Sequence, residues 1–63
     1  MEAEFYWSLF ESEGQQHGHG FSAYYVSARG EQVVVFRSAA QYRDEADAES
    51  AAIDYCKDLA RRP

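Results

Sequence analysis

The pair His17 and His19 is the pattern in this chain that comes nearest to a chemical site. Two imidazoles at alternate positions of an extended segment can turn toward one metal ion. A structural zinc site needs four ligands, but Glu11 and Glu13 flank a glycine-rich stretch, and Cys56 lies on the apolar face of a predicted helix. We therefore expect adventitious metal binding or none, and no cofactor, with a specific metal site at the two histidines as the alternative.

Catalysis by a nucleophile has little support in the sequence. A serine or cysteine nucleophile needs an oriented base beside it, and both histidines lie among glycines that leave the segment flexible. Gly14, Gly18 and Gly20 lack the spacing of a dinucleotide- or phosphate-binding loop, and a predicted strand follows them where such loops need a helix. With 63 residues, the chain has little room for a pocket beside its core. We expect a protein that is not an enzyme.

Charge argues against nucleic acid as a partner. Eleven acidic and six basic residues give a net charge of −5 and an isoelectric point near 4.7, which repels a phosphate backbone. Arginines near tyrosines, such as Arg29 and Arg37, leave single-strand binding as an alternative. The carboxylates of the predicted helix either face solvent without a function or bind a basic protein, and the candidate contact residues are Asp47, Asp54 and Asp58.

A chain of this length forms one domain, residues 1–63, around one small core. Folding at this size hides only about 60% of the surface of the open chain, so a monomer is marginally stable. The single cysteine, Cys56, cannot form a disulfide within the chain, which leaves a metal or a partner subunit as support. The sequence has no apolar run of roughly eighteen residues and no basic, apolar start, so we expect a cytoplasmic protein without membrane contact.

Three strands are predicted from aromatic and β-branched residues. The first is the aromatic run Glu4–Phe10, and the glycine-rich segment Glu11–Gly20 that follows it is predicted to be a mobile loop. The second strand covers Phe21–Ala28 and ends at a hairpin turn, Arg29-Gly30, where glycine accepts a positive φ. The third, Gln32–Arg37, contains three consecutive valines, and its continuous apolar character predicts burial on both faces.

One amphipathic helix is predicted at the end of the chain, over about Glu45–Arg61, after a connector. Asp44 is its expected N-cap, because its side chain can accept a hydrogen bond from the first turn. Acidic residues gather at its start and basic residues at its end, which complements the helix dipole. Its apolar arc consists of Ala48, Ala52, Tyr55, Cys56 and Leu59.

These elements predict an α+β fold, a three-stranded antiparallel sheet in the order β-β-β-α with the C-terminal helix packed on one face. The strands carry apolar side chains on both faces, whereas one helix covers only one of them. A second copy of the chain, packed about a two-fold axis, would cover the other face. We therefore expect a homodimer through the uncovered sheet face, with Tyr6, Phe10 and Val34 as interface candidates. The alternative is a monomer with scattered exposed rings.

A family pattern is present in the second half of the chain. It comprises Ala28–Val33, Arg37-Ser38, Tyr42–Glu49 and Ile53. In these residues the chain resembles the YegP-like family of small bacterial proteins. The likeness covers Phe21–Ile53 and, more loosely, Phe5–Leu9. The long segment before Phe21 and the arginine at the turn, where the family has asparagine, depart from the pattern.

The resemblance implies a three-stranded antiparallel sheet backed by one helix, a unit that the family often carries twice in one chain. If the second unit covers the sheet of the first, a chain with one unit is expected to recruit an identical chain. This agrees with the homodimer expected from the packing argument. The resemblance implies no activity, and it transfers no catalytic or binding residue to this chain.

Overall fold

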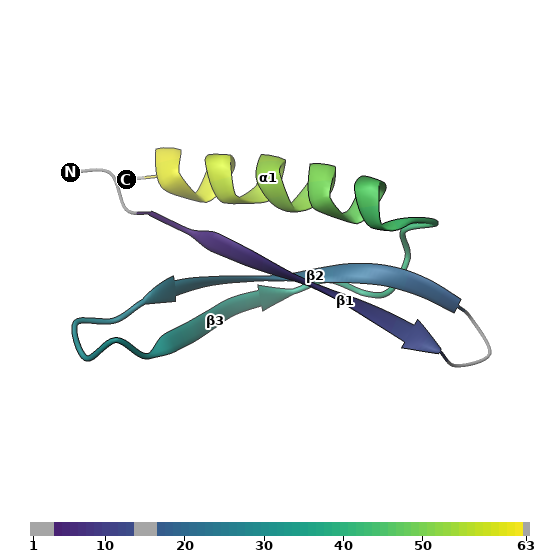
Figure 1. The fold of residues 1–63 in the computed structure, drawn as a ribbon. Helices are drawn as coiled ribbons and strands as arrows, with labels where there is room; N and C mark the ends of the chain where they lie inside the picture. Colours follow the sequence, from purple (N-terminus) through teal and green to yellow (C-terminus); the bar gives the residue numbers. More distant parts are fainter. Residues whose placement is uncertain (1–3, 14–16, 63) are drawn as a thin grey trace.

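The computed structural model describes residues 4–13 and 17–62. Strands β1 (Tyr6–Glu13), β2 (His17–Val26) and β3 (Gln32–Arg37) form an antiparallel sheet in the order β1-β2-β3. Helix α1 (Glu45–Arg61) lies across one face of this sheet (Figure 1). The predicted α+β fold with the order β-β-β-α is confirmed.

The prediction of a loop over Glu11–Gly20 was wrong, because β1 and β2 both extend into this segment. In the register of β1 and β2, Glu11 lies opposite His19 and Glu13 opposite His17, while residues 14–16 fall outside the described part of the chain. β1 therefore extends past its predicted end, and β2 begins before its predicted start. The composition was misleading because two of the glycines serve a close contact between backbones.

That contact is made by the connector between β3 and α1. Gly18 and Gly20 are buried, and a Cβ atom on Gly18 would overlap the carbonyl oxygen of Ala40. A Cβ atom on Gly20 would lie 2.9 Å from the carbonyl oxygen of Ala39 and would overlap the Phe10 ring. Further along the connector, Tyr42 pairs with His19 through two backbone hydrogen bonds of 2.9 and 3.1 Å. Glycine is thus required where the connector crosses β2.

The turn between β2 and β3 is the predicted one. Ser27 donates its backbone N–H to the carbonyl of Glu31 over 2.8 Å, and Gly30 donates back to the carbonyl of Ser27 over 2.9 Å. Gly30 has a φ of +83°, a conformation that costs glycine little. The turn joins β2 and β3 into a hairpin and exposes Arg29 at its tip.

The helix begins and ends at the predicted residues. The side chain of Asp44 accepts a hydrogen bond of 2.9 Å from the backbone N–H of Asp47, as expected of an N-cap. The buried helix residues are Ala48, Ala52 and Cys56. Because two of these are alanines, the helix axis can lie close to the sheet.

The core lies between α1 and the first two strands. Phe21 and Ala23 of β2 meet Ala52 and Cys56 of the helix, and the partly buried residues around them are Phe5, Leu9, Tyr42, Ala51, Tyr55 and Leu59. Since Phe21 and Ala23 face the helix, strand alternation places Tyr25 on the same side and Tyr24 on the opposite side. A ring contact between Phe5 and Tyr25, with centroids 6.4 Å apart, agrees with this placement.

The predicted burial of β3 on both faces was wrong. Val34, Val35 and Phe36 are 58%, 45% and 37% exposed. The physical reason is that α1 packs along β2 and the edge strand β1, and leaves the other edge strand, β3, largely uncovered. Side-chain contact between β3 and the helix includes Phe36, which stacks on Tyr55 at 4.4 Å. The pairing of β2 with β3 also shifts here: Ala23 pairs with Phe36 and Tyr24 pairs with Val34, so the ladder skips Val35.

Candidate functional site

The face of the sheet opposite the helix carries a row of apolar side chains that crosses all three strands. Tyr6 of β1 pairs with Tyr24 of β2, and Tyr24 pairs in turn with Val34 of β3. The two tyrosine rings lie 5.8 Å apart, and Tyr6 is 41% exposed. Val26, on the same face by strand alternation, is 49% exposed. We call these four residues the open row.

One end of the open row is tied to the start of the chain. The phenol of Tyr6 donates a hydrogen bond of 2.8 Å to the carboxylate of Glu4. This bond, together with the negative charge of Glu4, raises the pKa of the exposed Tyr6 hydroxyl. At neutral pH, Tyr6 therefore presents an uncharged phenol and an apolar ring edge.

The other half of the same face is covered. The guanidinium of Arg37 lies 4.3 Å above the centre of the Phe10 ring, a cation–π contact. Beside it, the connector carbonyls lie against Gly18 and Gly20. Of the interface candidates expected on this face, Tyr6 and Val34 fall in the open row, whereas Phe10 lies in the covered half and is only partly exposed.

The three acidic candidates lie on the solvent side of α1. Asp47, Asp54 and Asp58 are all exposed. Asp58 forms an ion pair with Arg62, with a distance of 2.7 Å between carboxylate and guanidinium. Because both groups are well exposed, this pair adds little to stability and offsets part of the acidic charge at that position.

An open groove of about 640 Å³ lies between the start of β1 and the C-terminal half of α1. Its wall includes Cys56, whose thiol donates a hydrogen bond of 3.6 Å to the backbone carbonyl of Tyr6. Burial raises the pKa of the Cys56 thiol, and the side chain is 6% exposed. Cys56 is thus held as a neutral thiol that fills the core, which is unlike the exposed, low-pKa thiolate of a catalytic cysteine.

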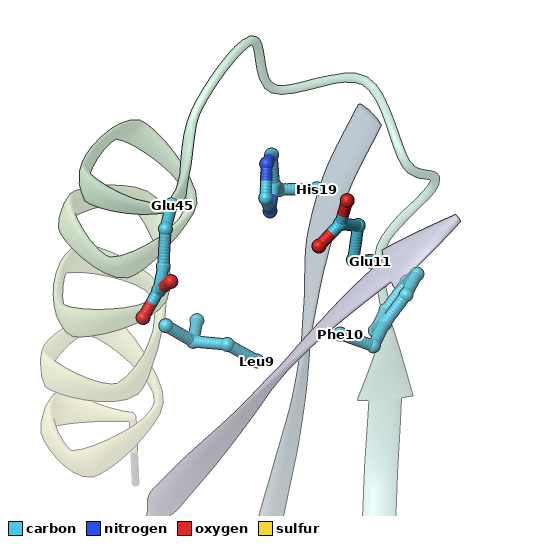
Figure 2. A pocket seen from close by; sticks show the side chains of 5 residues that line it. All are labelled: Leu9, Phe10, Glu11, His19 and Glu45. Carbon is cyan, nitrogen blue, oxygen red and sulfur yellow. The ribbon is translucent and has the colours of Figure 1, made fainter. Parts of the chain in front are cut away.

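A smaller hollow of about 160 Å³ lies at the opposite end, between β1, β2 and the first turn of the helix. In Figure 2 the carboxylate of Glu11 turns toward His19, its cross-strand partner, while the carboxylate of Glu45 turns toward Leu9. This hollow could not be predicted from the sequence, because residues 11–20 were expected to form a loop and not two paired strands. Among the side chains that the structure describes, which do not include that of His17, no three from His, Cys, Asp or Glu are grouped so that they could hold a metal ion.

Comparison of the chain with protein-family models, with curated proteins and with solved structures gives no match. No helix in the described part of the chain is long and apolar enough to span a membrane. The open row and the acidic face of α1 are therefore interpreted from their own chemistry.

Proposed function

We propose that this chain is a non-enzymatic protein that acts through protein–protein contacts, as a homodimer joined through the sheet surface that the helix leaves uncovered. The observation that carries the proposal is the open row, in which Tyr6, Tyr24 and Val34 present an apolar strip across the whole sheet. Apolar side chains grouped in this way on a small protein mark an interaction surface.

Three further points support the proposal. A 63-residue domain with one layer of helix on one sheet buries little apolar surface, so a partner adds needed stability. Membership of the YegP-like family forms part of the proposal, and the order of three strands followed by one helix supports it. The unpaired, buried thiol of Cys56 suits the reducing cytoplasm, where we place the protein.

A mass measurement in solution tests the dimer. Light scattering after size-exclusion chromatography, or sedimentation equilibrium, is expected to give a mass that rises from one chain toward two as the protein concentration increases from micromolar to millimolar. The apolar strip predicts this association because pairing removes it from water. A mass of 7.2 kDa, one chain, at every concentration would contradict the proposal.

A second candidate function is capture of a basic, nucleic-acid-binding protein by the helix carboxylates. It is favoured by the exposure of Asp47 and Asp54 on the helix side that faces away from the sheet, in a chain of net charge −5. Carboxylates on a rigid helix would attract a basic surface at long range and imitate a line of phosphates.

Charge reversal tests this second candidate. The triple variant Asp47→Lys, Asp54→Lys, Asp58→Lys is expected to lower the affinity for a lysine-rich peptide by at least tenfold, because three attractions become repulsions. Isothermal titration calorimetry at low salt measures the affinity. The matched control is Asp47→Asn, Asp54→Asn, Asp58→Asn, for which an intermediate loss is expected. Equal affinity of all three proteins would reject the acidic helix as the contact.

A further inference from the structure

Among residues 4–13 and 17–62, the large exposed apolar side chains are restricted to one half of the molecule. On β1 and β2 they occur where β1 begins and β2 ends, and on β3 they extend over the strand as far as Phe36; the full set is Tyr6, Trp7, Tyr25, Val26, Val34, Val35 and Phe36. In the strand register, the row formed by Trp7, Ala23 and Phe36 is the last to contain one of them. We call the part of the molecule from this row to the β2–β3 turn, with the C-terminal half of α1, the hairpin half (Figure 1).

These side chains lie on both sides of the sheet. Tyr6, Val26 and Val34 face away from the helix, whereas Tyr25 and Phe36 face toward it, beside the uncovered strand β3. The groove of about 640 Å³ between β1 and the helix belongs to the same half, since Trp7 is part of its wall. The hairpin half thus exposes apolar side chains on both faces of the sheet and not only on the open face.

The two halves of the molecule differ in charge, because one is balanced and the other is acidic. Among the described residues of the hairpin half, four acids are balanced by four bases: Glu4, Glu31, Asp54 and Asp58 against Arg29, Lys57, Arg61 and Arg62. The opposite half, which we call the acidic half, combines the tip of β1 with the start of α1. It holds six acids, Glu11, Glu13, Asp44, Glu45, Asp47 and Glu49, against two bases, Arg37 and Arg43.

We propose that a second copy of this chain binds the hairpin half with its own hairpin half, in a two-fold contact that covers residues on both sides of the sheet near β3. This inference rests on the proposed homodimer and assigns its interface. It differs from a face-to-face arrangement, because Tyr25, Val35 and Phe36 join Val34 in the contact, while Phe10 stays outside it.

The charge distribution is what favours a second copy as the occupant. Two chains of net charge −5 repel each other, and this repulsion is smallest when the acidic halves are farthest apart. Contact between hairpin halves meets this condition, since the molecule is 41 Å long and the acidic half, with its excess of four carboxylates over basic groups, lies beyond the contact. At physiological ionic strength the screening length is only about 8 Å, so the distant acidic halves barely oppose association.

The contact combines apolar side chains with balanced charges, and this determines how salt acts on it. The association constant is expected to change less than about twofold between low and moderate NaCl concentration, because few charges are brought together. Binding through the acidic half would instead weaken steeply as salt is added.

Two variants with the same added charge separate the halves. Val34→Lys places an ammonium group on the most exposed apolar residue of the hairpin half, and Ala46→Lys places one on an exposed helix position of the acidic half. We expect Val34→Lys to weaken self-association at least tenfold in sedimentation equilibrium, and Ala46→Lys to change it less than about twofold. Circular dichroism of each variant confirms that it is folded.

A measurement on the unaltered chain tests the same interface without any variant. Amide chemical shifts recorded over a concentration series are expected to move at Tyr6–Trp7, Tyr25–Val26 and Val34–Phe36, and to stay fixed at the acidic residues 44–49. If the chain dimerises but the moving shifts lie at residues 44–49, or Val34→Lys leaves the dimer intact, the hairpin interface is overturned and the homodimer stands. A chain that stays monomeric without any concentration-dependent shift overturns the homodimer itself.

Discussion

Replacement of Phe21 by alanine is expected to abolish cooperative folding at 25 °C. Phe21 is 2% exposed, and its ring lies 5.7–6.3 Å from the rings of Phe36, Tyr42 and Tyr55. Removal of a buried phenylalanine ring costs about 3–5 kcal/mol of unfolding free energy. A single small core in a chain of this length supplies no more than about 3–5 kcal/mol in total, so the variant has little or no stability left.

Urea titration followed by circular dichroism measures this effect. The unaltered protein is expected to give a sigmoidal transition, and Phe21→Ala a nearly linear change without a folded baseline. Phe36→Ala is the matched control, because it removes an identical ring from a position that is 37% exposed, and we expect it to lose only about 1 kcal/mol. Similar midpoints for the two variants would show that Phe21 is not the centre of the core.

Substitution of Gly18 by alanine is the second large effect that we expect. The new methyl group would overlap the carbonyl oxygen of Ala40, and both partners of this clash belong to backbone that no rotamer change can move aside. Forcing extra volume into such a contact costs about 1–3 kcal/mol, and the gain of about 0.4–1 kcal/mol from a stiffer unfolded chain offsets part of it. The net result is a less stable protein whose connector is displaced from β2.

The position of the damage distinguishes this clash from a general loss of stability. Hydrogen exchange is expected to accelerate most at the amides of His19 and Tyr42, which bond the connector to β2. Ser22→Ala, on the same strand and face as Gly18, is the control, and its effect is expected to lie within about 0.5 kcal/mol. Gly18→Ala with full stability and unchanged exchange at both amides would mean that the connector adjusts freely.

The helix could be predicted to the residue because its signals are local. Asp44 caps it, charges of suitable sign lie at its two ends, and the alanine and cysteine spacing marks its buried side. The alternation along β1 is equally informative, because successive side chains of a strand point to opposite faces and this separates Tyr6 from Phe5 and Leu9. Local signals of this kind depend only on neighbours within two turns of helix or two residues of strand.

The errors arose where a distant segment determines the outcome. Gly18 and Gly20 resemble loop residues until Ala39 and Ala40, twenty residues later, are placed against them. Phe10 was grouped with Tyr6 and Val34, but Arg37 lies over its ring and separates it from the open row. The three valines of β3 indicated a buried strand, whereas their exposure depends on where the helix lies across the sheet.

The bond from the Cys56 thiol to the carbonyl of Tyr6 joins residues 50 positions apart, from the first and the last elements of the chain. During folding, β1 and β2 can pair early, but the core stays open until Ala52 and Cys56 of the helix reach these strands. Closure of so long a loop is slow relative to helix formation. The hairpin of β1 and β2 therefore keeps its aromatic rings in water until the helix docks on it.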